Sequence, residues 1–114
     1  MARDVQSFGM PTDQYHEPPG ELSADVRTFA RVIASLQEEA EAIGWYEQRI
    51  SIETDEQARR IMEHAQREEF LHFSMDLEWL ARHQEKWRIA LRKILFKDGD
   101  IVELAEQAED EVED

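Results

Sequence analysis

The sequence predicts an all-α protein built around an antiparallel hairpin of two long helices. Charged residues make up 35% of the 114 residues, and the three prolines all lie within the first 20 residues. Beyond them, apolar residues recur with helical spacing, and a polar stretch at residues 51–55 divides this pattern into two long parts. A chain of this length forms one domain at most, with a small core.

The first helix is expected to start after Ser23, a plausible N-cap, and to run to about Ile52. Gly44 is the only helix-weakening residue inside it. Residues 1–20, with all the prolines and two of the four glycines, are expected to form a mobile or extended arm.

The turn at 51–55 contains Thr54 and Asp55, either of which can cap the next helix. The second helix is expected from about Glu56 to Arg82 or His83, and a third, shorter amphipathic segment from Gln84 to Phe96.

Residues 97–100 close this third segment, and residues 101–114 form an acidic tail. After about Ile101 there is almost no apolar stripe beyond Leu104 and Val112. We therefore expect a helical turn or two that then frays, and a tail that is dispensable for assembly and activity. The predicted organisation is an arm at 1–20, a helical domain at 21–100 and this tail.

A hairpin of this kind leaves an apolar face uncovered on each long helix. Two hairpins cover these faces by forming a four-helix bundle, so a dimer is expected. The two predicted faces are Val32, Leu36, Ile43, Glu47 and Ile50 in the first helix, and Ile61, Ala65, His72, Met75 and Trp79 in the second.

The net charge of -14, from 27 acidic and 13 basic residues, argues against nucleic acid and anionic membrane surfaces as partners. It suits a protein that attracts cations, although solubility alone explains it equally well. Without cysteine, disulfides, zinc–thiolate sites and iron–sulfur clusters are excluded. No apolar run reaches membrane-spanning length and no signal pattern opens the sequence, so the expected compartment is the cytoplasm.

One Glu-x-x-His motif, Glu69 to His72, is the clearest chemical signal, and Glu39 lies thirty residues upstream on the sister helix. Di-iron carboxylate bundles use one Glu on each of two helices and one Glu-x-x-His on each of two others. The chain thus holds half of such a site, and two chains would complete it. Carboxylate and imidazole are ligands that suit iron.

Other interpretations of these three residues stay open. Glu-x-x-His occurs by chance in many charged helices, and His72 can be a hydrogen-bonded core histidine. Glu39 and Glu69 can instead form ion pairs with a nearby arginine, for which the candidates are Arg49, Arg59 and Arg67.

Two aromatic residues follow Glu39 on the first helix. Tyr46 lies near the edge of the apolar face and could hydrogen-bond a metal-bound carboxylate, whereas Trp45 points almost opposite that face. Both are also explained as core or interface aromatics.

Three blocks of the sequence, Glu38–Arg49, His64–His72 and Met75–Leu80, resemble the encapsulated ferritins. These are ferritin-like cargo proteins of bacterial encapsulin nanocompartments. The similarity runs from about His16 to about Ile101.

The resemblance implies a two-helix protomer, a ferroxidase centre formed across the interface of two protomers, and assembly of dimers into a ring-shaped decamer. It implies oxidation of Fe(II) to Fe(III) at a di-iron centre, with storage of the iron inside the surrounding shell. The encapsulin shell protein is then a partner, and the chain lies within a nanocompartment in the cytoplasm.

By position, Glu39, Glu69 and His72 match the family's di-iron ligands, with Tyr46 at the catalytic centre and Trp45 beside it.

Further positions match the family's outer acidic residues. Glu38 and Glu41 match acids on the path by which metal enters, where other divalent cations such as calcium could also bind. His64 and Glu68 match an outer metal-binding patch, but Leu71 stands where that patch has a further acid.

The family's C-terminal targeting peptide, with small and apolar residues, has no counterpart in the final residues Glu-Asp-Glu-Val-Glu-Asp. We expect either that the chain is truncated or that it reaches its shell by another route. The alternative function is a non-catalytic acidic helical module that binds metal or a partner.

Overall fold

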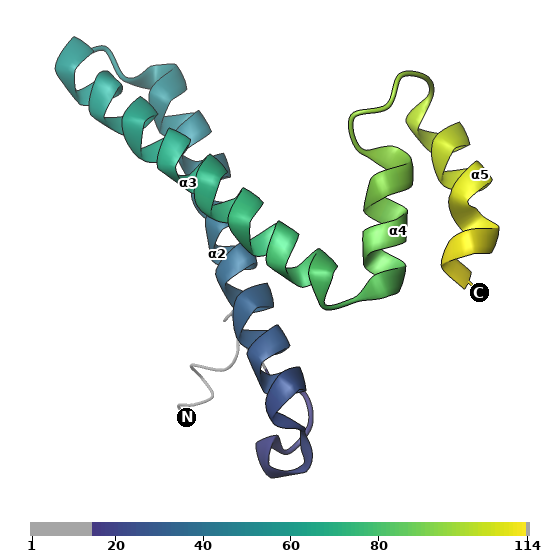
Figure 1. Ribbon diagram of the computed structural model, residues 1–114. Coiled ribbons are helices and arrows are strands. Elements are labelled where there is room, and N and C mark those ends of the chain that lie inside the picture. Colours follow the sequence, from purple (N-terminus) through teal and green to yellow (C-terminus); the bar gives the residue numbers. More distant parts are fainter. Residues whose placement is uncertain (1–14, 114) are drawn as a thin grey trace. The chain divides into compact units, whose positions relative to one another are not determined.

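A computed structural model describes residues 15–113 (Figure 1). These residues form the 3-10 helix η1 (Pro19–Glu21) and the α-helices α2 (Ala24–Ile52), α3 (Glu56–Arg82), α4 (Glu85–Ile94) and α5 (Ile101–Glu113), with no strand among them. The prediction of an all-α fold is confirmed. Within the same residues, no helix is both long and apolar enough to cross a membrane.

The chain divides into two compact units, one ending at Leu77 and the other beginning at Glu78. The predicted division into arm, helical domain and tail follows other boundaries and remains a prediction. Most of the predicted N-terminal arm, residues 1–14, lies outside the described residues.

Helix α2 begins and ends where the sequence predicts. The Ser23 Oγ accepts a hydrogen bond from the backbone N of Val26 at 3.1 Å, which satisfies one of the free N–H groups of the first turn. Arg27 Nη1 donates to the carbonyl oxygens of Pro19 at 2.8 Å and Leu22 at 3.1 Å. These two bonds hold η1 against the start of the long helix.

Helix α3 is capped by Asp55, whose Oδ2 accepts from the backbone N of Ala58 at 2.8 Å. Between Ile52 and Glu56 the chain has only three non-helical residues. So short a connection brings α3 back along α2, as the predicted hairpin requires.

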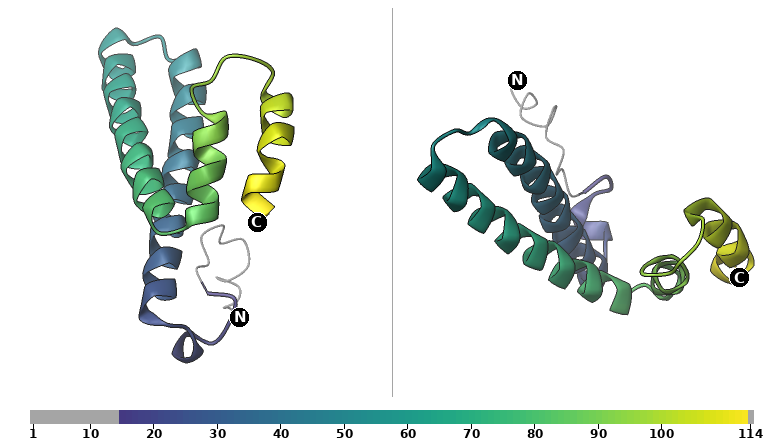
Figure 2. Two further views of the ribbon diagram at one scale, coloured as in Figure 1. Left: turned by 45° about the vertical axis from the view of Figure 1, so that its right-hand side comes forward. Right: turned by 90° about the horizontal axis from the view of Figure 1, so that it is seen from above.

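In the first unit, α2 and the part of α3 up to Leu77 lie side by side and antiparallel (Figures 1 and 2). Gln66 of α3 is only 8% exposed, and its Nε2 donates to the Ile43 carbonyl at 3.1 Å and to Glu47 Oε1 at 2.9 Å. The amide therefore ties the two helices together at one level of the hairpin.

The apolar face predicted for the hairpin is open in a single chain. No residue of the 29-residue α2 is buried, and on α3 Ile61 is 61% and Met75 63% exposed. One chain alone therefore buries little of the surface whose spacing predicted the two helices.

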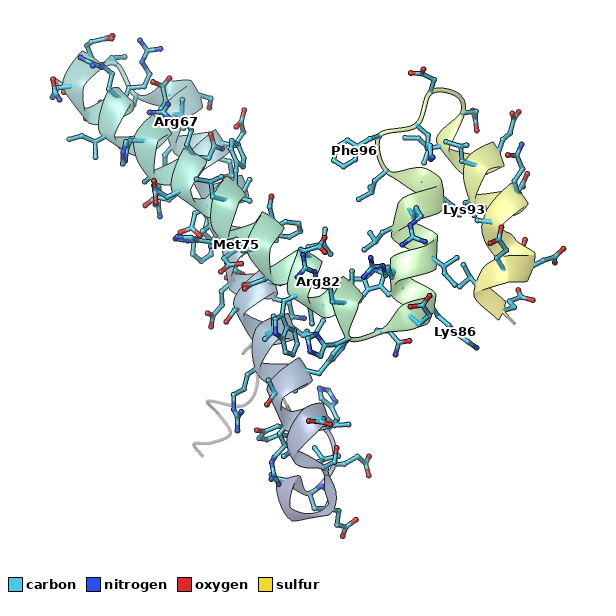
Figure 3. All side chains as sticks on the ribbon, viewed as in Figure 1. Arg67, Met75, Arg82, Lys86, Lys93 and Phe96 are labelled. Atoms are coloured by element: carbon cyan, nitrogen blue, oxygen red, sulfur yellow. The ribbon has the colours of Figure 1, made fainter. Side chains whose placement is uncertain are left out.

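In the second unit, α4 packs against α5. Gln84 caps α4 by accepting from the backbone N of Lys86 at 3.3 Å, and the helix ends at Ile94, close to the predicted limits. Phe96 follows with a φ of 60° and is fully exposed, and Figure 3 shows its side chain pointing away from α4 and α5.

The expectation of a fraying tail is wrong, because residues 101–113 form the helix α5. Asp100 Oδ1 caps it by accepting from the backbone N of Glu103 at 3.0 Å, and Ala108 is buried to 3% exposure. An ion pair joins Lys93 of α4 to Glu111 at 2.8 Å. The tail thus has a partner to pack against, which the sequence interpretation did not foresee.

Candidate metal centre

The Glu-x-x-His motif lies in the first unit, in the interior of α3. Because residues three apart share one helix face, Glu69 Oε1 and His72 Nδ1 come within 3.5 Å of each other. The side chain of Glu69 is 26% exposed and that of His72 46%. The imidazole is therefore not a hydrogen-bonded core histidine within the single chain, and half of its surface is open to a ligand or a second chain.

Glu39 of α2 faces α3 at the level of this motif. Burial is the largest cause that raises the pKa of Glu39 to about 7, followed by a hydrogen bond with Asp76 and by the negative charges of Asp76, Glu69 and Glu38. These neighbouring carboxylates make the electrostatic potential at Glu39 negative, and this potential would attract a cation.

Asp76 was missed in the sequence interpretation, although its position gives a signal. It follows His72 by four residues and Glu69 by seven, so all three lie on one face of α3. The motif therefore extends to Glu-x-x-His-x-x-x-Asp.

The Glu39–Asp76 contact lacks a donor when both carboxyl groups are ionised. A hydrogen bond between them requires a proton on one of the two, and without it the buried atoms Glu39 Oε1 and Asp76 Oδ2 have no hydrogen-bond partner. Buried oxygens without a donor are costly, and a divalent cation can satisfy them. The carboxylates of Glu39, Asp76 and Glu69 and the imidazole of His72 therefore fit a metal ion that prefers oxygen and nitrogen ligands.

A complete single-chain site is not present in the described part of the molecule. Across residues 15–113, no group of three or more His, Cys, Asp and Glu side chains is arranged to hold a metal ion. The structure brings Glu39 towards Asp76 and Glu69, and pairs Glu69 with His72, but does not gather all of them around one point.

The ion-pair alternative finds no support among the described residues, where no arginine pairs with Glu39 or Glu69. Arg59 instead pairs with Glu56 at 2.8 Å, and the Arg49 guanidinium lies over the Tyr46 ring, 5.4 Å from its centroid. Tyr46 is partly buried beside this cation, whereas Trp45 is 50% exposed.

The two acids assigned to metal entry differ in exposure. Glu38 is exposed and adds to the negative field at Glu39, whereas Glu41 is partly buried. Neither of them contacts the Glu69–His72 pair through a hydrogen bond or ion pair within the described residues.

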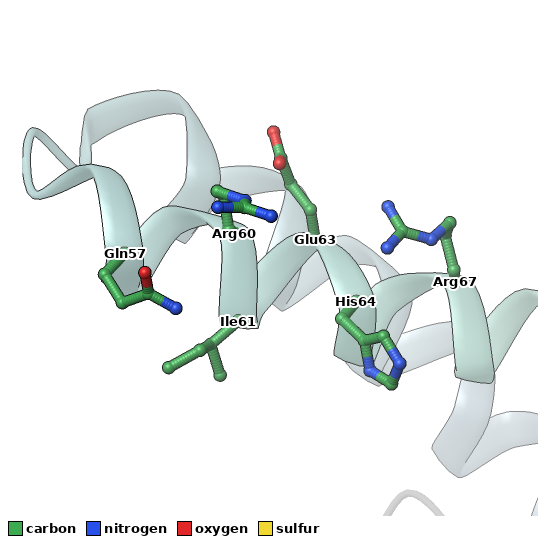
Figure 4. A pocket seen from close by; sticks show the side chains of 6 residues that line it. All are labelled: Gln57, Arg60, Ile61, Glu63, His64 and Arg67. Carbon is green, nitrogen blue, oxygen red and sulfur yellow. The ribbon is translucent and has the colours of Figure 1, made fainter.

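The outer patch at His64 has surroundings that do not favour a cation. His64 lines a surface hollow of about 360 Å³ on α3 together with Gln57, Arg60, Ile61, Glu63 and Arg67 (Figure 4). Figure 4 shows Glu63 and His64 pointing to opposite sides of the helix. Two arginines beside the imidazole, and Leu71 in place of an acid, weaken the case for a metal here; Glu68 is exposed nearby.

Comparison with known proteins identifies the family. The profile of the EncFtn-like family matches residues 14–98. A "Ferritin-like protein" of Thermotoga maritima is 48% identical over 95 residues, which are 83% of this chain and 83% of that protein. An "Encapsulated ferritin-like protein" of Rhodospirillum rubrum is 41% identical over 95 residues, 82% of this chain and 68% of that one.

A solved structure shares the fold. The crystal structure of protein ne0167 from Nitrosomonas europaea superposes with a TM-score of 0.75 at 38% identity, covering 78% of this chain and 99% of that one. The family profile spans the helices α2 and α3, which carry the candidate centre, as well as the sequence blocks that carry the resemblance. The chain belongs to the EncFtn-like family of encapsulated-ferritin-like proteins.

Proposed function

We propose that the protein is a ferroxidase that oxidises Fe(II) to Fe(III) at a di-iron centre shared by two chains. The observation that carries the proposal is the pair of buried, donorless oxygens on Glu39 and Asp76, next to an open Glu69–His72 pair. These groups form an incomplete ligand set on a hairpin whose long helix α2 buries none of its residues. A second hairpin would both cover the apolar face and double the ligands.

In the proposed centre, Glu39, Glu69 and His72 of the two chains would hold two iron ions. Oxidation of both Fe(II) ions to Fe(III) would transfer two electrons to one dioxygen, which takes up two protons and leaves as hydrogen peroxide. The carboxylates favour the more highly charged product, because their negative charges stabilise Fe(III) more than Fe(II). Tyr46 lies two turns from Glu39 on the same face of α2 and is assigned a hydrogen bond to a bound carboxylate, with Trp45 packing against a neighbouring chain.

Glu38 and Glu41 are assigned to the path by which cations enter, where calcium could also bind, because both carry negative charge on α2 beside Glu39. An outer metal site at His64 and Glu68 would have to form against the positive charges of Arg60 and Arg67, which line the same hollow as His64.

The name of the Rhodospirillum rubrum relative suggests enclosure of this chain in an encapsulin nanocompartment, where the oxidised iron would be stored. The proposed assembly is a dimer, with dimers closing into a decameric ring. In this assembly the exposed faces of α2 and α3 contact other copies of the same chain. The net charge of -14 disfavours nucleic acid as a partner.

The test is anaerobic loading with Fe(II), followed by admission of air while ferric absorbance in the near ultraviolet is recorded. The proposal expects rapid formation of Fe(III), faster than in buffer without protein. The alternative, a non-catalytic acidic module, expects iron binding without faster oxidation.

Light scattering on the same samples tests the shared site. A protein that remains monomeric both with and without Fe(II) contradicts the proposal, because residues 15–113 of one chain do not supply a complete ligand set.

A further inference from the structure

Asp76 is an acidic residue of the first unit that the proposed ligand set does not use. It lies on α3, is partly buried, and faces Glu39 across the hairpin. An aspartate at such a position normally pairs with a cation or a backbone N–H group. Its Oδ2 has neither, and the side chain interacts with another carboxyl group, that of Glu39.

We propose that Asp76 is a further carboxylate ligand of the shared metal centre, supplied by each chain in addition to Glu39, Glu69 and His72. This inference rests on the proposed function and deepens it. The first support is geometric: Glu69, His72 and Asp76 follow one line along α3, and Glu39 reaches the same line from α2.

The second support is the state of the oxygens. Glu39 Oε1 and Asp76 Oδ2 are both buried without a donor, so removal of either carboxylate would leave the other with fewer like charges beside it. When both are ionised the two carboxylates repel each other, and a cation that binds between them would remove this repulsion.

The third support is charge balance. Two Fe(III) ions carry six positive charges, whereas Glu39 and Glu69 of two chains supply only four negative ones. Asp76 of the two chains would supply the other two. An additional carboxylate per chain therefore favours the oxidised centre over the reduced one, because the extra negative charge interacts more strongly with Fe(III).

Cobalt(II) is a suitable probe, because air does not oxidise it readily and its visible absorption changes with the ligand set. The full chain, Asp76→Asn and Asp98→Asn are titrated with Co(II) by calorimetry and by visible absorption. Asp98→Asn is the matched control, since it makes the same chemical change at an exposed residue of the second unit.

The expected result is that Asp76→Asn weakens Co(II) binding by roughly 10–100-fold, at least the loss seen when an outer partner of a metal ligand is removed. Its Co(II) spectrum should also differ from that of the parent, while Asp98→Asn matches the parent in both. Equal affinities and superimposable spectra for the parent and Asp76→Asn overturn the inference.

Metal-free melting separates ligation from a structural role. A ligand role predicts that Asp76→Asn melts no lower than the parent without metal, because the substitution removes a like-charge contact. A variant that melts lower and keeps the parental Co(II) spectrum shows that Asp76 only supports the fold, and the inference fails.

The same titrations keep the two proposals apart. A parent chain that binds neither Co(II) nor Fe(II) removes the proposed function, and the ligand role of Asp76 with it. A parent that binds and oxidises iron, together with an Asp76→Asn variant of unchanged metal affinity and spectrum, removes only the role of Asp76.

Discussion

The Gln66 amide of α3 donates to both the Ile43 carbonyl and the Glu47 carboxylate of α2, at 3.1 and 2.9 Å. These two hydrogen bonds fix the register between the antiparallel helices α2 and α3. A step of about six residues back along α2 from this level leads to Glu39, and the same step forward along α3 leads to His72. Gln66 therefore sets the register that places Glu39 between Glu69 and Asp76.

Replacing Gln66 by Ala should lower the free energy of unfolding by about 1–3 kcal/mol, since a buried amide loses its partners and leaves a small gap. Urea denaturation of the metal-free protein measures the change. Gln57→Ala, at an exposed position of the same helix, is the control and should change stability little. Equal losses in both variants would mean that the cross-helix bonds do not contribute.

The ligand assignment predicts that Glu39→Ala, Glu69→Ala and His72→Ala each remove or strongly slow iron oxidation. The loss should exceed the roughly 10–100-fold effect of removing an outer partner of a ligand, while circular dichroism shows unchanged helix content. Glu41→Ala should have a smaller effect, on delivery of iron rather than on its oxidation. Parental oxidation by His72→Ala would show that the centre has been placed wrongly.

The metal-free protein should become less stable as the pH rises. In the folded chain the pKa of Glu39 is raised from 4.5 to about 7, mainly by burial, so the folded state binds this proton more tightly than the unfolded state does. The resulting stabilisation is fully present below pH 4.5 and is lost as the pH rises to about 7.

Glu39→Gln cannot ionise and should lack this loss. The difference in free energy of unfolding between Glu39→Gln and the parent, measured with a chelator present, should therefore grow across this window and then level off. Glu68→Gln, at an exposed position of α3, serves as the control. A difference that stays constant with pH for Glu39→Gln would contradict the burial of this carboxyl group.

The positions of the long helices could be predicted because local signals agree with the spacing. Ser23 and Asp55 are strong caps, and the helices start directly after them. Glu39, Glu69 and His72 could be selected because their residue types are typical metal ligands at a typical spacing.

Gln66 and Asp76 could not be selected in the same way. A glutamine on a helix face is usually exposed, and only the packing of α3 on α2 shows that this one is buried. Asp76 lies outside the Glu-x-x-His motif, and its importance depends on Glu39, which is 37 positions away in the sequence. Both are tertiary relationships.

Helix α5 was missed because its apolar stripe contains an alanine. Leu104, Ala108 and Val112 recur every four residues, and Asp100 with Glu103 has the spacing of a capping box. Without Ala108, Leu104 and Val112 are eight residues apart, and the stripe is not apparent. Since alanine is also the best helix former, it contributes to α5 twice, through propensity and through close packing.

The packing of α5 on α4 predicts that Ala108→Asp disrupts the second unit. Ala108 is buried to 3% exposure, so a carboxylate there would lose its hydration without gaining a partner. We expect a loss of about 2–3 kcal/mol in the free energy of unfolding, in the upper part of the usual range for single substitutions, and faster amide hydrogen exchange in α4 and α5.

Ala105→Asp, on the exposed side of α5, is the matched control, and its amide hydrogens should exchange like those of the parent. Iron binding should be retained in both variants, because Glu39, Glu69 and His72 all lie in the first unit. If Ala108→Asp exchanges no faster than Ala105→Asp, α5 does not stabilise α4, and residues 101–113 are the dispensable extension that their acidic composition suggested.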